Sequence, residues 1–149
     1  PEVNEPSYDL FEWRGAHFTA FNCFELSNIE HRSRFRSKID LLVASEFNKD
    51  VNYFSSIVES SARDIHCFVA QVNDSKYGDS RITQPASTNY RDLIKVKGGK
   101  NPTILVDTIN LNDLREFQLK EYSGQKDLGT FKPTPPDFDK DEVMRRIKS

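Results

Sequence analysis

Two continuous apolar runs separated by a helix-patterned segment constrain the fold of this chain most strongly. Residues 39–44 (Ile-Asp-Leu-Leu-Val-Ala) and 67–73 (Cys-Phe-Val-Ala-Gln-Val-Asn) have strand length. Such hydrophobicity is typical of strands buried on both faces. Between them, apolar residues recur at steps of three and four, which indicates one buried face of a helix over 51–65: Val51, Phe54, Ile57, Val58, Ala62 and Ile65. This order predicts an α/β fold with helices packed on a mixed sheet.

Weaker patterns extend this arrangement on both sides. We expect further strands at 11–14, 16–22, 91–97 and 103–109, and helices at 26–38, 111–122 and about 139–148. The Gly98-Gly99-Lys100-Asn101 turn predicts that 91–97 and 103–109 form an antiparallel hairpin. After Gly124 the composition shifts, and Lys132-Pro133-Thr134-Pro135-Pro136 favours an extended arm. We therefore predict a body over residues 1–124 and, over 125–149, a Pro-rich tail with a short terminal helix.

Composition excludes several classes of protein. The chain has 149 residues, enough for one core. A net charge of −2 argues against a dedicated nucleic-acid binder, so nucleic acid is expected only through a parent protein. Two cysteines make no disulfide framework, and no segment resembles a signal peptide or membrane span. We expect a cytoplasmic location and no membrane contact. Because the chain begins with Pro-Glu-Val-Asn and not Met, we also expect a fragment or processed product.

Cys23 is the side chain with the strongest pattern for chemistry. The apolar run Ala16-His17-Phe18-Thr19-Ala20-Phe21-Asn22 ends at Cys23-Phe24-Glu25, and a helix-like run follows. A strand, a reactive side chain and a helix form the layout of a nucleophile elbow, where a sharp turn exposes the nucleophile above a sheet. Backbone N–H groups at such a turn can stabilise an oxyanion. The alternative is that Cys23 is a small buried residue at a strand end.

Other cysteine and histidine sites have weaker support. Cys67 opens a buried strand, which predicts core packing. A Cys-His protease needs a histidine oriented by Asn or Asp, yet His17 falls inside a strand and His31 on the charged helix. His66 falls at a helix end, where a protonated imidazole would favour the helix dipole. Two distant cysteines and three scattered histidines lack metal-ligand spacing, so no metal site is predicted.

Several segments in the same order resemble the nitrilase, or carbon–nitrogen hydrolase, superfamily. The run Phe21-Asn22-Cys23-Phe24-Glu25 is similar to the family's nucleophile segment, and Ile39-Asp40-Leu41-Leu42-Val43 to its next strand. The helix ending Ser61-Ala62-Arg63-Asp64-Ile65-His66 and the strand at 67–73 follow in family order. Tyr77-Gly78-Asp79-Ser80-Arg81-Ile82 stands where the family has a Gly-rich loop and a strand. The resemblance covers residues 16–119.

This resemblance implies a fold and a mechanism. The fold would be half of an α-β-β-α sandwich, with the chain giving roughly half of each sheet and ending in the Pro-rich arm. Cys23 would attack a small amide or nitrile. Phe24, Glu25, Glu46, Phe47 and Arg81 would form the oxyanion and substrate pocket, although a surface salt bridge is the alternative for Arg81. No dissociable cofactor is implied.

Two parts of the family pattern are missing. The family triad is Glu, Lys and Cys, and residues 1–22 contain no lysine, whereas Glu2 or Glu5 would match an auxiliary Glu. The resemblance therefore implies the C-terminal half of a domain, with Glu and Lys supplied by an N-terminal half or larger parent polypeptide. It also implies a homo-oligomer, with the helix at 26–38 as an interface.

Two functions are kept open. One is a carbon–nitrogen hydrolase that is completed by the absent half. The other is a non-catalytic assembly module. Residues 77–81 and 97–101 also resemble the nitrilase-like region fused to bacterial antiviral reverse transcriptases, and the Pro-rich arm with its charged terminal helix suits docking onto a partner.

Overall fold

The computed structural model describes residues 8–149. It contains a single mixed sheet of six strands in chain order, β1-β2-β3-β4-β5-β6. The strands are β1 (Phe11–Trp13), β2 (Ala16–Asn22), β3 (Leu41–Glu46), β4 (Phe68–Asn73), β5 (Ser80–Thr83) and β6 (Asp92–Val96). The central pairs β2/β3 and β3/β4 are parallel, and the outer pairs are antiparallel. The mixed α/β class and the β–α–β unit are thereby confirmed.

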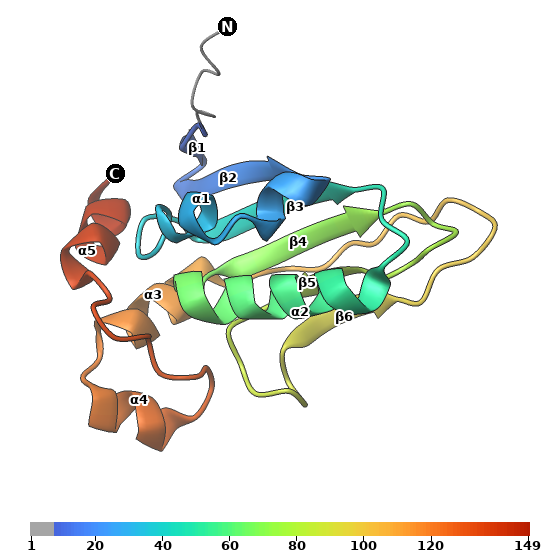
Figure 1. The fold of residues 1–149 in the computed structure, drawn as a ribbon. Helices are drawn as coiled ribbons and strands as arrows, with labels where there is room; N and C mark the ends of the chain where they lie inside the picture. Colours follow the sequence, from blue (N-terminus) through green and yellow to red (C-terminus); the bar gives the residue numbers. More distant parts are fainter. Residues whose placement is uncertain (1–7) are drawn as a thin grey trace, which may run out of the picture.

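Helix α2 (Val51–Ser61) covers one face of the sheet (Figure 1). Asp50 caps its start by accepting a hydrogen bond from the Tyr53 amide. Its apolar face packs on the strands in the main core, which includes Phe54, Ile57, Val58, Leu42 and Val69. One π-helical turn (Ala62–His66) then joins α2 to β4. The predicted helix over 51–65 is therefore present with a change of helix type at its end.

Three C-terminal helices gather at one end of the sheet (Figure 1). They are α3 (Leu111–Leu119), α4 (Tyr122–Leu128) and α5 (Lys140–Lys148). Behind the sheet, Leu114 and Phe117 of α3 form a second core with Phe68 of β4 and Phe131 of the tail. The predicted terminal helix is confirmed. The position after residue 124, where the tail was expected to begin, lies inside α4, and Phe131, just before the Pro-rich segment, packs in this second core.

Three expectations about the elements are wrong. The helix at 26–38 is a 3-10 turn (Cys23–Ser27) followed by α1 (Ile29–Ser33). Beyond Ser33 the amides of residues 34–36 bond three residues back, and Ser37 takes a left-handed φ of 68° before Ile39 enters the core. Strand β6 pairs with β5 rather than with 103–109, which forms no strand. The six strands also make one whole sheet, not half of each of two.

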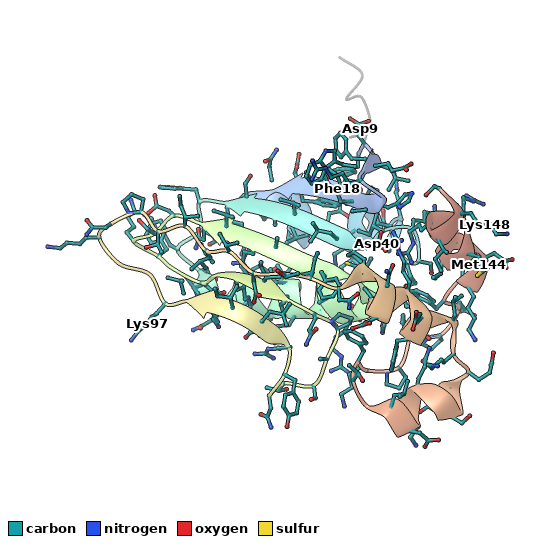
Figure 2. The ribbon with its side chains drawn as sticks, turned by 180° about the vertical axis from the view of Figure 1, so that it is seen from behind. Asp9, Phe18, Asp40, Lys97, Met144 and Lys148 are labelled. Carbon is teal, nitrogen blue, oxygen red and sulfur yellow. The ribbon has the colours of Figure 1, made fainter. Side chains whose placement is uncertain are left out.

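The rear face of the sheet is only partly covered. Helix α3 covers the end where β3 and β4 begin, and an extended segment, residues 100–109, runs along the rest towards α3 (Figure 2). We call this segment the strap. Ala20 of β2 and Val72 of β4 remain exposed on this face. None of the helices among residues 8–149 is long and apolar enough to cross a bilayer.

Candidate functional site

Cys23 lies at the turn that follows β2. Its backbone φ is +33°, a sparsely populated conformation for a residue with a side chain. Such backbone strain is found preferentially at functional turns. The thiol is partly buried and packs against the core under α2. Among the described residues, no hydrogen bond joins it to His17, His31 or His66, so no base is paired with it inside this part of the chain.

Glu25 holds the turn in place. Its carboxylate turns back and accepts a hydrogen bond from the Asn22 amide at 2.9 Å. This is the reciprocal arm of a capping box, a device that fixes how a chain enters a helical turn. Phe24, between Cys23 and Glu25, is 77% exposed. Glu25 is thus placed to orient the elbow, and the Phe24 ring is free to contact another molecule.

Glu46 and Phe47 follow the neighbouring parallel strand. Asn22 of β2 is in register with Ser45 of β3, so the next positions along the two strands are Cys23 and Glu46. Parallel strands end at the same edge of a sheet. Five of the six predicted site residues therefore gather at this edge, and only Arg81 does not: Cys23, Phe24, Glu25, Glu46 and Phe47. Phe47 is 62% exposed and contacts Tyr77 edge-on. Lys76 lies over both rings, with Nζ 5.0 Å from the centre of Phe47 and 4.8 Å from that of Tyr77.

The Glu46 carboxyl group is buried beside a second acid. Burial raises its pKa to about 7, the charge of Asp79 adds to the rise, and Arg81 and the Gln71 hydrogen bond oppose it. Gln71 donates to one carboxyl oxygen at 3.1 Å, while the other oxygen has no partner among the described residues. A carboxyl group with this pKa can hold or release a proton near neutral pH.

Arg81 lies in the interior, so the surface salt bridge considered for it is wrong. Its guanidinium donates to Ser55 Oγ at 2.8 Å and to the Ser55 carbonyl at 3.0 Å. It also forms ion pairs of 3.3–3.5 Å with three carboxylates, those of Glu59, Asp79 and Asp92. Gln71 bridges Arg81 to Glu46. Arg81 therefore reaches the Cys23 edge only through this chain of hydrogen bonds.

The sequence reasoning missed two members of this network. Asp79 is buried and pairs with Lys95 at 2.9 Å as well as with Arg81. Gln71 sits in the middle of a strand and links the two predicted pocket residues. Asp79 follows Gly78 in a turn, where an acid usually faces solvent, so the only available signal was its proximity to Arg81 in the sequence.

Cys67 and His66, the other residues considered for chemistry, lie in the packed interior. Cys67 is fully buried, and burial raises the pKa of its thiol, which confirms its predicted core role. His66 is also buried, which lowers its pKa to about 4, so the predicted protonated imidazole at a helix end is wrong. Glu2 and Glu5 lie outside the described residues. Within residues 8–149, no three His, Cys, Asp or Glu side chains are grouped so as to hold a metal.

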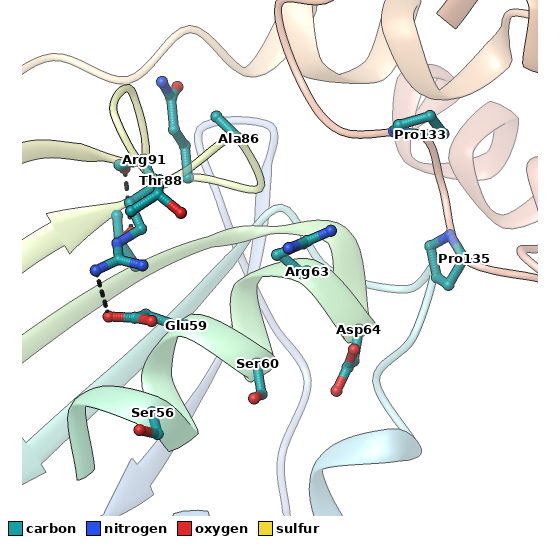
Figure 3. Close-up of a pocket in the computed structure, with 12 residues that line it drawn as sticks. Ser56, Glu59, Ser60, Arg63, Asp64, Ala86, Thr88, Arg91, Pro133 and Pro135 are labelled. Carbon is teal, nitrogen blue, oxygen red and sulfur yellow. Dashed lines mark hydrogen bonds and ion pairs between the residues drawn. The ribbon is translucent and has the colours of Figure 1, made fainter. Parts of the chain in front are cut away.

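A polar cavity of about 460 Å³ lies along the flank of α2 (Figure 3). Ser56, Glu59, Arg63, Arg91 and Pro133 are among its lining residues. Glu59 and Arg91 pair across it at 2.6 Å. None of the six predicted site residues lines this cavity, so its size does not support the cysteine site.

Comparisons with known proteins agree on the fold. No family model and no curated protein matches the chain. Several solved structures do, including a CN-hydrolase superfamily protein from Xanthomonas campestris with an arsenic adduct in its active site. It has a TM-score of 0.65 and 18% identity, over 82% of this chain and 50% of that one.

Two further similar structures come from Nesterenkonia sp. AN1. The NitN amidase has a TM-score of 0.54 and 14% identity, over 84% of this chain and 50% of that one. An amidase mutant with the acetamide moiety of fluoroacetamide added covalently to its active-site cysteine has a TM-score of 0.52 and 15% identity, over 64% and 40% of the two chains. The chain spans about half the length of these structures. It therefore has a mixed α/β fold that matches about half of a nitrilase-superfamily chain.

Proposed function

We propose that this chain is half of a nitrilase-like carbon–nitrogen hydrolase domain in which Cys23 is the nucleophile. The observation that carries the proposal is the strained backbone of Cys23, with φ +33°, at the edge of the sheet shared with Glu46. The fold match to nitrilase-superfamily structures supports it. So does the covalent adduct on the active-site cysteine of the similar Nesterenkonia amidase.

The reaction follows from the chemistry of a thiolate. Cys23 Sγ attacks the amide carbon, and collapse of the tetrahedral intermediate breaks the C–N bond to give a thioester and an amine that leaves with a proton. Water then attacks the thioester, which releases the acid and restores the thiol. A nitrile would react through a thioimidate. The family resemblance assigns the base to a Glu, and oxyanion stabilisation to a Lys and the Phe24 N–H, with the Glu and Lys supplied by a complementary half.

The pocket residues act by position and by charge. Phe24 and Phe47 provide exposed rings at the edge where Cys23 lies. Glu46 provides a carboxyl group with a pKa raised by burial to about 7, so it is partly protonated at neutral pH. Glu25 orients the elbow through the Asn22 amide. Arg81 contributes through Gln71 by holding the Glu46 carboxyl group in place.

A second proposal is an assembly module that keeps the fold without catalysis. It is favoured by the exposed Phe24 and Phe47 rings and by the absence of a base hydrogen-bonded to Cys23 among the described residues. Exposed aromatic side chains of this kind are typical of binding surfaces. The resemblance to the nitrilase-like region of antiviral reverse transcriptases belongs to this second proposal. The homo-oligomer that the nitrilase resemblance implies is proposed with either function.

Alkylation by iodoacetamide at pH 7 distinguishes the two proposals. The chain carries its own control, because buried Cys67 should react only after denaturation. In Cys67→Ser of the chain joined to its complementary half, which supplies the base, an activated Cys23 should react at least about tenfold faster than a free cysteine derivative, since the thiolate is the reactive species. A rate equal to that of the free thiol would contradict the hydrolase proposal and favour the module.

Assays with simple amides give a second test. We expect residues 1–149 alone to show no turnover, because residues 1–22 contain no lysine to complete the triad. Turnover that is lost in Cys23→Ala would contradict this requirement for a complementary half.

A further inference from the structure

The strap is an extended segment whose backbone is unpaired. Among the described residues, no backbone–backbone hydrogen bond involves residues 100–109, and the only hydrogen bond within the strap is local, from the Thr108 amide to its neighbour Asp107. Backbone N–H and C=O groups in a folded protein are nearly always paired or solvated. A ten-residue segment without pairing is therefore open along its length to a partner.

The side chains of residues 104–106 alternate in exposure as in a strand. Ile104 is 90% exposed and Val106 is 82% exposed. Leu105, between them, faces the sheet and lines a small cavity of about 240 Å³ with Val72 and Val96. An apolar run with side chains on both faces, two of them β-branched, is typical of a strand that is covered on both sides. The sequence predicted a strand here, yet residues 8–149 supply no strand that pairs with it.

We propose that residues 103–109 form a strand by pairing with an extended segment of the complementary half-domain. This inference rests on the proposed half-domain and names the element through which the two halves join. The chain spans only half the length of the similar structures, and the part of such a domain that this chain does not match is the proposed occupant. Addition of a strand pairs the free backbone groups, and alternating apolar side chains on the partner would cover Ile104 and Val106.

Hydrogen exchange of the strap tests the pairing. Two proteins are compared. The short chain is residues 1–149 alone. The long chain adds, before residue 1, the segment that the native reading frame encodes, long enough to match the part of the similar structures that this chain does not cover. In the short chain, amides of 103–107 should exchange at nearly unprotected rates. In the long chain, they should exchange at least about tenfold more slowly.

A matched pair of substitutions assigns the effect to the strap. Ile104→Lys and Tyr90→Lys each replace a mostly exposed apolar side chain, 90% and 71% exposed, with the same cation. Neither should change the melting temperature of the short chain by more than about 1 °C, because neither side chain is packed. In the long chain, only Ile104→Lys should restore fast exchange over 103–107.

Three results would overturn the proposal. One is equal exchange of the strap in both chains, and another is a reading frame with no upstream segment. The third is protection already present in the short chain that grows with its concentration, since this would make a second copy the occupant. None of these readouts depends on Cys23, so failure of the thiol test and failure of the strap test are distinguishable.

Discussion

Arg115 of α3 donates two hydrogen bonds to the carboxylate of Asp40 at the start of β3, from Nε at 2.9 Å and from Nη2 at 2.6 Å. Arg146 of α5 donates to the same carboxylate, and the His17 amide completes its set of donors at 2.9 Å. Asp40 is fully buried. One carboxylate therefore ties two C-terminal helices to the beginning of the central strand.

Replacing Asp40 with Asn should be the most damaging single change of charge in the chain. It leaves the guanidinium groups of Arg115 and Arg146 buried without a counter-charge, and breaking a buried pair in this way costs about 3–5 kcal/mol. Urea unfolding at pH 7 measures the loss in free energy of unfolding. Asp127→Asn, at an exposed position in α4, is the control and should change that free energy by less than about 0.5 kcal/mol.

The loss of stability at low pH should depend on the Asp40 carboxylate. Burial would raise the pKa of Asp40, but the Arg115 hydrogen bonds and the charge of Arg146 outweigh it and lower the pKa below 3.8. A lowered carboxyl pKa contributes stability above pH 3.8, which is lost as pH falls through the folded-state value. The Asp40→Asn variant should lose this part of the acid dependence.

Arg146→Met should cost less than Asp40→Asn. The variant removes one of two guanidinium groups that share a single carboxylate, so Asp40 keeps Arg115 and no buried charge is left unpaired. Gln118 Oε1 loses its 2.9 Å donor, and one such loss costs about 1–3 kcal/mol. Urea unfolding ranks the two variants. A larger loss in Arg146→Met would show that the helix anchor matters more than the charge balance.

Glu46 should make the protein less stable as pH rises. Its pKa is raised from 4.5 in the unfolded chain to about 7, mainly by burial, so the folded state binds the extra proton. Its contribution is fully present below pH 4.5 and is lost between pH 4.5 and 7. With solvent screening, Glu46→Gln should gain about 1–2 kcal/mol over wild type at pH 8 and nothing at pH 4. Equal effects at both pH values would rule out this titration.

His66 should make the protein more stable as pH rises, over nearly the same pH range. Burial lowers its pKa from 6.5 to about 4, while Nε2 donates to the Lys132 carbonyl at 2.8 Å. A lowered histidine pKa gives stability above pH 6.5 that is lost as pH falls towards 4. His66→Asn, which tolerates the local φ of 62°, should flatten this loss and lower stability at pH 7 by about 1–2 kcal/mol. Urea unfolding from pH 4 to 8 separates the two groups.

Local patterns predicted the elements whose partners lie within the described chain. Strand β2 has its predicted bounds, and α2 begins where Asp50 caps it, because burial of one face sets the period of the residues. The strap shows the limit of this reasoning. Its alternating residues predicted a strand, but a strand also needs a partner, and the turn at Gly98 pointed to the wrong one.

The sequence predicted which residues of the candidate site lie at strand ends, but not which distant residues surround them. Cys23 and Glu46 each follow an apolar strand, and parallel pairing brings the two strand ends together. The environment of Arg81 could not be predicted from the sequence, because its three carboxylate partners come from α2, a turn and β6. Whether an arginine is buried depends on such distant charges, and one sequence does not encode their distances in any short pattern.

Gly78 and Gly98 permit the close contact of two loops beside Asp79. Gly78 has φ +78°, and a Cβ added there would lie 1.7 Å from the Lys97 carbonyl oxygen. Gly15 has a nearly equal φ of +77°, yet a Cβ there meets nothing within 4 Å. Comparing the two positions separates the cost of the backbone conformation from the cost of the clash.

Gly15→Ala should cost only the left-handed conformation, about 1–2 kcal/mol. Gly78→Ala should cost more than about 4 kcal/mol or prevent folding, since backbone must move to make room. Gly99→Ala, which has open space and no such φ, should lie within about 0.5 kcal/mol of wild type. Urea unfolding measures all three. Equal losses at Gly15 and Gly78 would mean that the loop of Lys97 moves aside freely and that the contact does not fix the position of Asp79.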